Sequence, residues 1–512
     1  MKYNIVILKE NITKLLVFSC TIELVFYFSF DVLAIILFIS ISWFFSYKFV
    51  FTKHNVKYYP LPTFLLIGYT FFYIILPVPA TLIELKPVNF NLKNSLDTFF
   101  HILALNVCLT STFGLYKRVI LNNKLRSILK NTQFFRVLSN REIIVLSILG
   151  LTISSLDILI YGKWHNDEVV IKKHFVFEMF GFFKAFTVAS SSLILPYFKL
   201  NKSKSKSSIW IVISISTIIF FVGIAANVRT TSISYIIHIF ICAFFLYLLD
   251  KPSIKVRTWL IAVVLIGIVL FEDISRAIVI SRSEKTNMSG IEMLNKTLDV
   301  YNNKELLDKY KKMNENKNVI SANTWDERYI DNSLLSRFCS VKTIDETIYY
   351  SKKIGFNNEK MLNNYSLQIL MILPARICYF LGISESERKK IIGYSETDYL
   401  YSLAVNDVSG LGNFKIGSIQ GLGLAMFGYW YLIIVSFLFF IIFFLLDSTT
   451  DIVKGEIVFS LWAFINLFFV FYLTSPGHNF HTELRYIIRG FFESIFFYLV
   501  GLYISKKFIK MK

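Results

Sequence analysis

The sequence predicts an all-α polytopic membrane protein with about twelve transmembrane helices and one large outer loop containing short helices. Three observations predict this fold class. Hydrophobic residues make up 55% of the chain and aromatic residues 17%, which excludes an ordinary soluble domain. Apolar stretches long enough to cross about 30 Å of hydrocarbon recur along the sequence. One long polar interval, from Ser281 to Gly417, separates nine of these stretches from three.

Each predicted span contains roughly 20 mostly apolar residues, the length that a membrane-crossing helix needs. The nine spans before the polar interval are Leu15–Phe30, Val32–Phe51, Leu61–Ile83, Phe99–Leu115, Ile143–Tyr161, Phe175–Phe198, Ile209–Ala226, Thr231–Leu249 and Trp259–Ile280. The three after it are Ile419–Leu446, Ile457–Leu473 and Leu484–Ile504. We therefore expect transmembrane helices one to nine in residues 1–280, the outer loop in 281–418, and helices ten to twelve in 419–512.

The distribution of Lys and Arg predicts the orientation. With the N-terminus inside, the predicted cytoplasmic segments carry twenty-five Lys and Arg residues, whereas the short outer loops carry seven. This bias follows the positive-inside rule, so the net charge of +19 is a topology signal and does not predict a nucleic-acid partner. The polar interval carries nineteen basic and seventeen acidic residues from Arg282 to Lys415, and is nearly neutral. We expect both termini in the cytoplasm and the interval outside.

The metal-binding residue types show no spacing that predicts a metal or a disulfide framework. The five cysteines are scattered, and three of them lie inside predicted spans. His478 and His481 lie close together, but two histidines without a third ligand are weak evidence for a metal site. We expect no cofactor.

The polar interval has predicted internal order. Helical spacing predicts helices at Ile291–Asn314 and Leu334–Tyr350. Tyr365–Leu381 is apolar but is broken by Pro374, so we expect it to dip toward the membrane surface or to pack on the helix bundle. The glycine-rich stretch Ser409–Gly417 then leads into the tenth span.

Two arginines mark the outer ends of spans seven to nine. Arg229 follows a helix end in the sequence GIAANVRTT, in a turn too short to let it move far. Its planar guanidinium suits a lipid diphosphate, and contact with phospholipid headgroups is the alternative. Arg276 lies four residues after Glu272 at the end of span nine, and either joins this positive site or pairs with that glutamate.

The start of the last span carries the most informative pattern. If this helix begins near His481, then His481, Arg485, Arg489 and Glu493 recur every fourth residue and share one face. Two arginines that enter a membrane span on one stripe are costly unless they face a polar cavity. The pattern therefore favours a functional role over anchoring to headgroups.

These features resemble the oligosaccharide repeat-unit polymerases of the Wzy type, which share features with O-antigen ligases. The similar pieces span most of Phe221 to Ile504: GIAANVRTT with Arg229, SLLSRFCSV with Arg337, MILPARICYF with Pro374 and Arg376, SGLGNFKIGSIQGLGLAMFGYWYL, and RYIIRGFFESIFFYL with Arg489 and Gly490. The sequence departs from the family pattern at the proline–arginine site, where Ala375 separates the two residues.

No paired aspartates with metal-binding spacing appear in the sequence, so we expect a metal-independent reaction. The resemblance implies a glycosyltransferase of the bacterial cytoplasmic (inner) membrane, acting in O-antigen, lipopolysaccharide or capsule biosynthesis. Such an enzyme transfers the growing glycan from polyprenyl diphosphate to an incoming lipid-linked repeat unit on the outer face. The implied partners are the polyprenyl-diphosphate-linked oligosaccharide, membrane lipids, a flippase and a chain-length regulator.

The residues fit roles in that reaction. Fixed cations near a low-dielectric boundary stabilise the negative charge that develops on a departing diphosphate, so we expect Arg229, Arg485 and Arg489 there. The further candidate substrate-binding residues are Arg337, Arg376 and Arg276. His481 is the predicted base for the acceptor hydroxyl because an imidazole titrates near neutral pH. Glu493 or a carboxylate of the polar interval is the alternative base.

Two other functions remain open. A flippase or other polysaccharide transporter would also use about twelve spans, but the two halves of the chain show no similarity and the long outer interval would lack a purpose. An O-antigen ligase, which moves finished glycan onto another acceptor, would use the same arginines.

Overall fold

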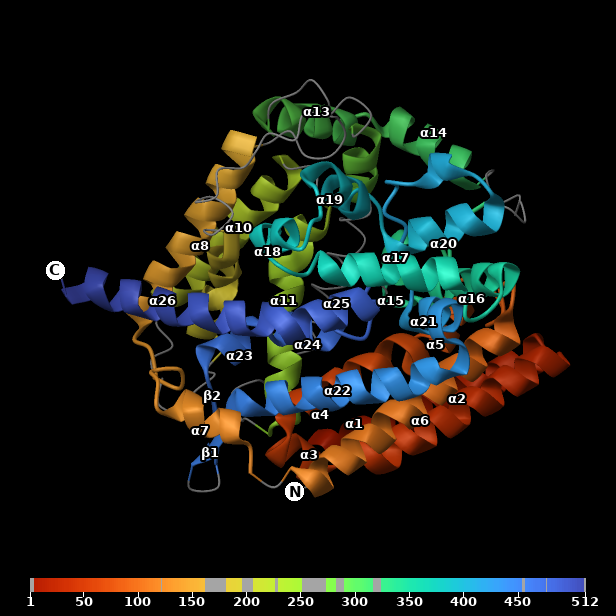
Figure 1. Ribbon diagram of the computed structural model, residues 1–512, viewed down its shortest axis with the longest axis horizontal. Helices are drawn as coiled ribbons and strands as arrows, with labels where there is room; N and C mark the ends of the chain where they lie inside the picture. The colour runs from red at the N-terminus through yellow and green to blue at the C-terminus, as the bar shows by residue number, and fades with distance from the viewer. Residues whose placement is uncertain are drawn as a thin grey trace. The chain divides into compact units, whose positions relative to one another are not determined.

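The computed structural model of the chain describes residues 4–120, 122–161, 181–195, 206–225, 229–250, 273–281, 290–315, 324–453, 456–475 and 477–510 (Figure 1). Within these residues the regular structure is helical except for one antiparallel hairpin of β1 (Thr450–Val453) and β2 (Glu456–Phe459). The predicted all-α class is confirmed. The small hairpin was not predicted.

The chain divides into two compact units. Unit 1 comprises Met1–Leu125, Ser321–Ser448 and Phe469–Phe492, and unit 2 comprises Arg126–Ile320, Thr449–Phe468 and Glu493–Lys512. This division crosses the polar interval, which the sequence presented as one segment. Its first part belongs to unit 2, and the part from Ser321 onward belongs to unit 1.

Unit 1 holds the longest apolar helices together with most of the polar interval. Its N-terminal elements are α1 (Asn4–Phe26), α2 (Phe30–Phe49), α3 (Lys53–Tyr58), α4 (Pro60–Thr70), the π-helical turn η1 (Phe71–Ile75), α5 (Pro77–Ile83) and α6 (Ser95–Val119). Its later elements are α15 (Ser333–Phe338), α16 (Val341–Ile354), α17 (Glu359–Leu370), α18 (Ala375–Phe380), α19 (Glu385–Ile392), α20 (Glu396–Val405), η4 (Val408–Gly410), α21 (Ile419–Phe427), η5 (Gly428–Trp430), α22 (Tyr431–Ser448), α25 (Phe480–Arg485) and η6 (Tyr486–Gly490).

Helices α2, α4, α6 and α22 pack against one another in unit 1 (Figure 1). A buried polar chain joins three of them: Asn106 donates to the Ser42 carbonyl at 2.8 Å, and the Thr70 hydroxyl donates to Ser46 at 3.1 Å. Interhelical hydrogen bonds of this kind hold apolar helices together in lipid, where a hydrophobic driving force between helices is missing. The packing therefore suits a membrane bundle.

The described residues include fewer long apolar helices than the predicted twelve spans. Four are long and apolar enough to cross a membrane: Phe30–Phe49, Ser95–Val119, Ile419–Ser448 and Phe480–Ile509. A fifth is the pair Pro60–Ile75 and Pro77–Ile83, bent by 41° where η1 meets Pro77. Proline has no amide hydrogen to continue a helix, so a bend at this position is expected. The chain is membrane-embedded by this criterion, and twelve spans remain a prediction.

Unit 2 contains α8 (Asn140–Tyr161), the 3₁₀ helix η2 (Gly181–Leu193), α10 (Lys206–Ala225), α11 (Arg229–Leu248), a helical segment at 273–281, α13 (Gly290–Asn302), α14 (Lys304–Glu315), β1, β2, α23 (Leu461–Ile465) and most of α26 (Phe491–Lys510). Helices α8, α10 and α11 occupy predicted spans five, seven and eight. The short apolar helices within α10 and α11 are Ile209–Ala225 and Ile233–Leu248.

The prediction that the eleventh span, Ile457–Leu473, is one continuous helix is wrong. It consists of β2, α23 and α24 (Leu467–Tyr472). Ser460 caps α23 by accepting a hydrogen bond from the Ala463 amide, and Asn466 interrupts the helix by donating back to the Trp462 carbonyl. Hydropathy alone does not distinguish a buried strand from a buried helix, so the prediction missed these breaks.

The polar interval is helical but more divided than predicted. The helix predicted at Ile291–Asn314 is the pair α13 and α14, and the one predicted at Leu334–Tyr350 is the pair α15 and α16. The predicted break in Tyr365–Leu381 is confirmed, because α17 ends at Leu370 and Pro374 is the N-cap of α18.

Candidate active site

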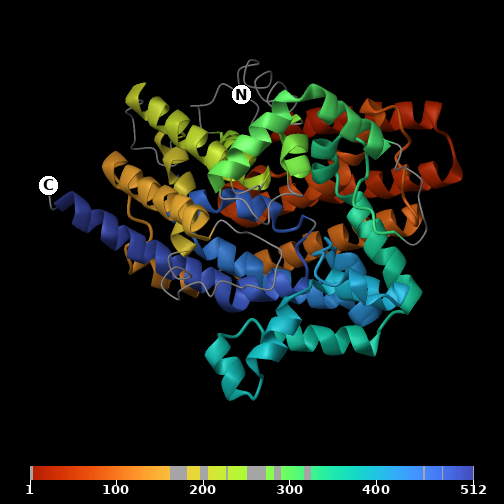
Figure 2. The same ribbon diagram turned by 90° about the horizontal axis from the view of Figure 1, so that it is seen from above.

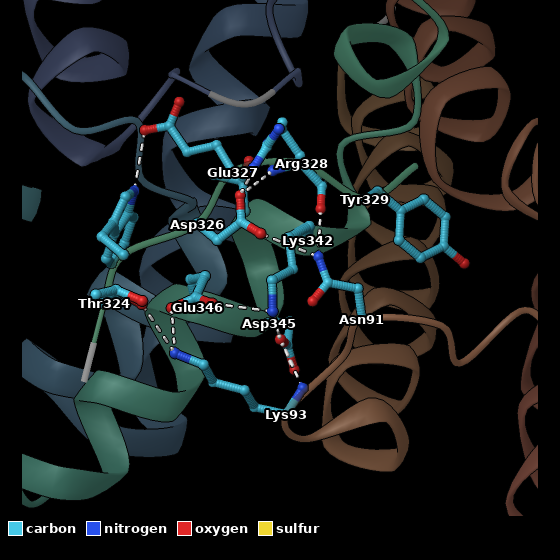
Figure 3. Close-up of polar contacts among 12 residues, drawn as sticks. Asn91, Lys93, Thr324, Asp326, Glu327, Arg328, Tyr329, Lys342, Asp345 and Glu346 are labelled. Carbon is cyan, nitrogen blue, oxygen red and sulfur yellow. Dashed lines mark hydrogen bonds and ion pairs between the residues drawn. The ribbon is translucent and has the colours of Figure 1, made fainter. Parts of the chain in front are cut away.

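A dense polar clamp fixes the polar interval to the loop between α5 and α6 within unit 1 (Figure 3). The Asp345 carboxylate accepts hydrogen bonds from the Lys93 amide at 2.9 Å and the Asn94 amide at 2.6 Å, where α6 begins. Glu346 forms ion pairs of 2.9 Å with Lys93 and Lys342. Each of these charges has a partner of the opposite sign. We therefore assign this clamp to positioning and not to chemistry.

Further contacts extend the clamp along the same loop. Glu84 accepts hydrogen bonds from the Asp331 and Asn332 amides at 2.8 and 2.7 Å. The Asn91 side chain donates to Asp326 and to the Arg328 carbonyl (Figure 3). Burial raises the pKa of the Glu346 carboxyl, although the neighbouring lysines oppose that shift. Removal of a lysine would therefore leave buried carboxylates without their counter-charges.

Helix α16, which the clamp holds in place, is hydrogen-bonded to the start of α21. The Thr347 hydroxyl lies 2.6 Å from the Ser418 hydroxyl, and Ser351 donates to the Gly421 carbonyl at 2.7 Å. The absence of a side chain at Gly421 permits this approach, since a Cβ there would lie 2.3 Å from the Thr347 Cβ. Helix α21 in turn contacts α25.

The segment that enters the last long helix lies against these elements. Gly477 adopts a φ of +90° and donates its amide to the Gly417 carbonyl at 3.1 Å, which joins this segment to the glycine-rich stretch before α21. Asn479 then caps α25 by accepting a hydrogen bond from the Thr482 amide at 2.9 Å. The Phe480 ring lies 5.5 Å from the Phe427 ring and 6.4 Å from the Tyr365 ring. Helix α17 of the polar interval thus covers α25.

The buried face of α25 carries an acid. Phe480, Glu483 and Tyr486 follow one another at three-residue intervals and are all buried. The Glu483 side chain lies 3.5 Å from His478 Nδ1, yet neither its oxygens nor that nitrogen forms a hydrogen bond to any described residue. The Tyr486 hydroxyl is likewise buried without a hydrogen-bond partner in the described part of the chain.

These groups gather around one aromatic ring. The Phe469 ring lies 5.8 Å from the His478 ring and 5.1 Å from the Tyr486 ring. Buried polar groups are nearly always satisfied in folded proteins, and an ionisable residue inside an apolar helix is a functional-site hypothesis by default. Glu483 was not among the site residues predicted from the sequence. Its spacing from Phe480 and Tyr486 was the available signal.

The predicted residues His481, Arg485 and Arg489 lie beside this acid on α25 and η6. The His481 ring is half-buried, and its Nδ1 forms no hydrogen bond to the described residues. Arg485 is exposed one turn later, and Arg489 is partly buried within η6. The start of this candidate membrane span thus carries an imidazole, a buried carboxyl group and two guanidinium groups within nine residues of the sequence.

The predicted four-residue stripe is interrupted. Residues Tyr486 to Gly490 form a π-helical turn, in which the Phe491 amide donates to the Tyr486 carbonyl. A π turn contains about one more residue than an α turn, so the regular α-helical spacing does not continue from Arg485 to Arg489 and Glu493. Such turns occur frequently at functional sites.

Of the other predicted arginines, the structure describes the side chains of Arg376 and Arg276. Arg376 is exposed on α18, and Arg276 in unit 2 pairs with Asp273 at 3.0 Å. Arg229 is the first residue of α11 and Arg337 lies in α15, but both side chains fall outside the described structure, as does Glu272.

No metal-binding cluster accompanies the site among the described residues, where no group of three or more His, Cys, Asp and Glu is placed to hold an ion. A metal-independent reaction therefore stays an expectation from the sequence.

Comparison of the chain with protein-family models, with curated proteins and with solved structures gives no match, so its function has to be inferred from its residues and their geometry.

Proposed function

We propose that the protein polymerises lipid-linked oligosaccharide repeat units on the outer face of a bacterial cytoplasmic membrane. It would transfer the growing glycan from polyprenyl diphosphate to an incoming lipid-linked unit. The proposal rests on the occurrence of His481, Glu483, Arg485 and Arg489 together at the start of the last long apolar helix, where α17 of the polar interval contacts α25.

The arginines suit the leaving group. When the glycan leaves its carrier, the bond between the anomeric carbon and the diphosphate oxygen breaks and negative charge develops on the phosphate. Arg485 and Arg489 would neutralise that charge, because a guanidinium stays ionised and donates two parallel hydrogen bonds to phosphate oxygens. Both arginines lie at the end of an apolar helix, where the local dielectric constant is lower than in water. Their stabilisation of the phosphate charge is therefore stronger there.

The acid–base groups suit the acceptor. A hydroxyl of the incoming unit forms the new bond to the anomeric carbon and must lose its proton. We assign that proton to His481, whose Nδ1 is free of hydrogen bonds to the described residues. Glu483 with His478 is the competing base, because its carboxyl group lies on the adjoining buried face of the same helix.

Substitution of the arginines tests this proposal. Arg489→Ala should lower the rate of chain elongation about 100-fold or more, so that single lipid-linked units accumulate. Arg229→Ala should do the same if it shares the phosphate site. The control is Lys353→Ala, which removes an exposed charge from α16. If both arginine variants are present at normal protein levels and still make long glycan, these arginines do not form the phosphate site.

A further inference from the structure

The segment from α17 to α19 has apolar side chains that the described part of the chain leaves exposed. Phe380 at the end of α18 is 90% exposed, Leu381 53% and Ile377 45%. Leu367 on the outward face of α17 is 45% exposed. Figure 2 shows this segment, coloured teal, at the margin of unit 1. A contiguous apolar patch of this kind marks a binding surface.

The start of α17 contacts a segment that carries two exposed aromatic residues. Tyr429 and Trp430 are 60% and 69% exposed where the apolar helix α22 begins, and these two residue types concentrate at membrane–water interfaces. The Asn358 amide donates to the Ala425 carbonyl at 2.8 Å, and the Phe356 ring lies 5.9 Å from the Tyr429 ring. Helix α17 therefore begins beside this pair of aromatic residues.

The charges around the apolar patch complement lipid phosphate groups. Arg376 and Lys390 are exposed on α18 and α19. The two acidic residues of α19 are engaged locally, since Glu387 completes the capping box with Ser384 and Glu385 pairs with Lys389 at 3.1 Å. Exposed cations next to inserted apolar side chains are typical of segments that lie in the interface plane of a bilayer.

We propose that α17 and α18 lie on the leaflet that faces the polar interval, with Ile377, Phe380 and Leu381 inserted at the boundary between headgroups and acyl chains. The occupant of the apolar surface is phospholipid, and Arg376 contacts a lipid phosphate. This assignment takes Arg376 out of the predicted substrate-binding set. It depends on the membrane embedding of the chain and not on the proposed polymerase activity.

A photo-crosslinking experiment tests this placement in the full-length protein. Phe380 is replaced by p-benzoylphenylalanine, and the protein is reconstituted into vesicles of phosphatidylethanolamine and phosphatidylglycerol that contain radiolabelled phospholipid. The matched control carries the same crosslinker at Lys353, which is exposed on α16. A second probe at Leu381 guards against poor folding of the first variant.

Illumination should attach labelled lipid to the crosslinker at residues 380 and 381. The control with the crosslinker at residue 353 should form no lipid adduct. A crosslink from residue 380 to another protein segment or to a second protein would overturn the proposal, because the patch would then be a protein interface. The absence of any adduct at residues 380 and 381 in folded protein would also overturn it, because the patch would then face water.

Discussion

His481 and Glu483 lie two residues apart on α25 but have different surroundings. The His481 ring is half-buried beside the exposed Arg485, whereas Glu483 is fully buried next to His478. If substrate reaches His481, the imidazole can take a proton from it directly. The buried Glu483 carboxyl group would have to act through His478.

This difference predicts unequal effects of substitution. His481→Ala should lower the elongation rate about 100-fold or more, while Glu483→Gln should lower it less than about tenfold. The measurement is the initial rate of glycan lengthening by purified full-length protein. An unchanged rate in His481→Ala together with a large loss in Glu483→Gln would transfer the base to the pair of Glu483 and His478.

Glu396 in the polar interval predicts a pH dependence of stability. Neither of its oxygens has a hydrogen-bond partner in the described structure, and burial raises the pKa of its carboxyl to about 8. In the folded protein Glu396 keeps its proton up to about pH 8. In the unfolded chain the same carboxyl group releases its proton at the lower, ordinary pKa of a glutamate. Stability should therefore fall as the pH rises between those two pKa values.

Glu396→Gln should remove this dependence, since glutamine is uncharged at every pH. The variant should have a higher Tm than the natural chain at pH 8, and the difference should shrink toward pH 5. Thermal unfolding of full-length protein in nanodiscs provides the measurement, with the exposed Glu359→Gln as control. A Tm difference that does not change with pH would show that Glu396 is ionised in the folded state.

The sequence was only partly informative at the scale of residues. The helix at His481 and the presence of Arg485 and Arg489 on it were predictable from their spacing. The π turn at Tyr486–Gly490 was not, because it depends on packing around the helix and leaves no local signal. The acid Glu483 was overlooked because a buried carboxyl group looks like any polar residue until its neighbours are known.

At the scale of elements, the contact between α16 and α21 requires a glycine. A Cβ at Gly421 would lie 2.3 Å from the Thr347 Cβ and 2.5 Å from its carbonyl carbon, so Gly421→Ala should separate the helices and lower the Tm. Gly114→Ala on α6 is the matched control, since its Cβ would meet nothing within 4 Å. An equal Tm for the two variants would contradict this packing.

The clamp on the α5–α6 loop predicts a second loss of stability. Lys342 is 1% exposed and pairs with Asp345 and Glu346 at 2.9 Å, so Lys342→Ala would leave buried carboxylates with fewer counter-charges. The expected cost is about 3 to 5 kcal/mol, against less than about 1 kcal/mol for the exposed Lys353→Ala. Faster amide exchange in α16 of the Lys342 variant would report it, and equal protection in both variants would argue against a buried network.

Element boundaries were predictable where one residue determines them. Pro374 separates α17 from α18, and the apolar helices α2, α6 and α22 lie where hydropathy predicted spans. The eleventh span failed because β2, α23 and α24 are all apolar, and their division depends on Ser460 and Asn466. Apolar composition predicts burial, but the kind of element depends on its caps and partners.

At the scale of the whole molecule, contacts within unit 1 agree with the predicted sides of the membrane. The loop at Lys86–Asn94, predicted outside, joins the polar interval, which was also predicted outside. At the other end of the same helices, the Lys117 side chain donates to Asn55 at 2.9 Å, and both belong to predicted cytoplasmic segments. Charge counting predicted only that the two members of each pair lie on the same side of the membrane. The contacts themselves, and the folding of the interval onto α21 and α25, depend on long-range packing that no local pattern reveals.

The most direct test of the central claim is reconstitution of the full-length protein in proteoliposomes with a polyprenyl-diphosphate-linked repeat unit on the side of the polar interval. We expect a ladder of longer lipid-linked glycans and release of polyprenyl diphosphate, with both lost in Arg489→Ala. If single units instead cross the bilayer unchanged and no longer product forms, the protein is a transporter and the proposed polymerase is contradicted.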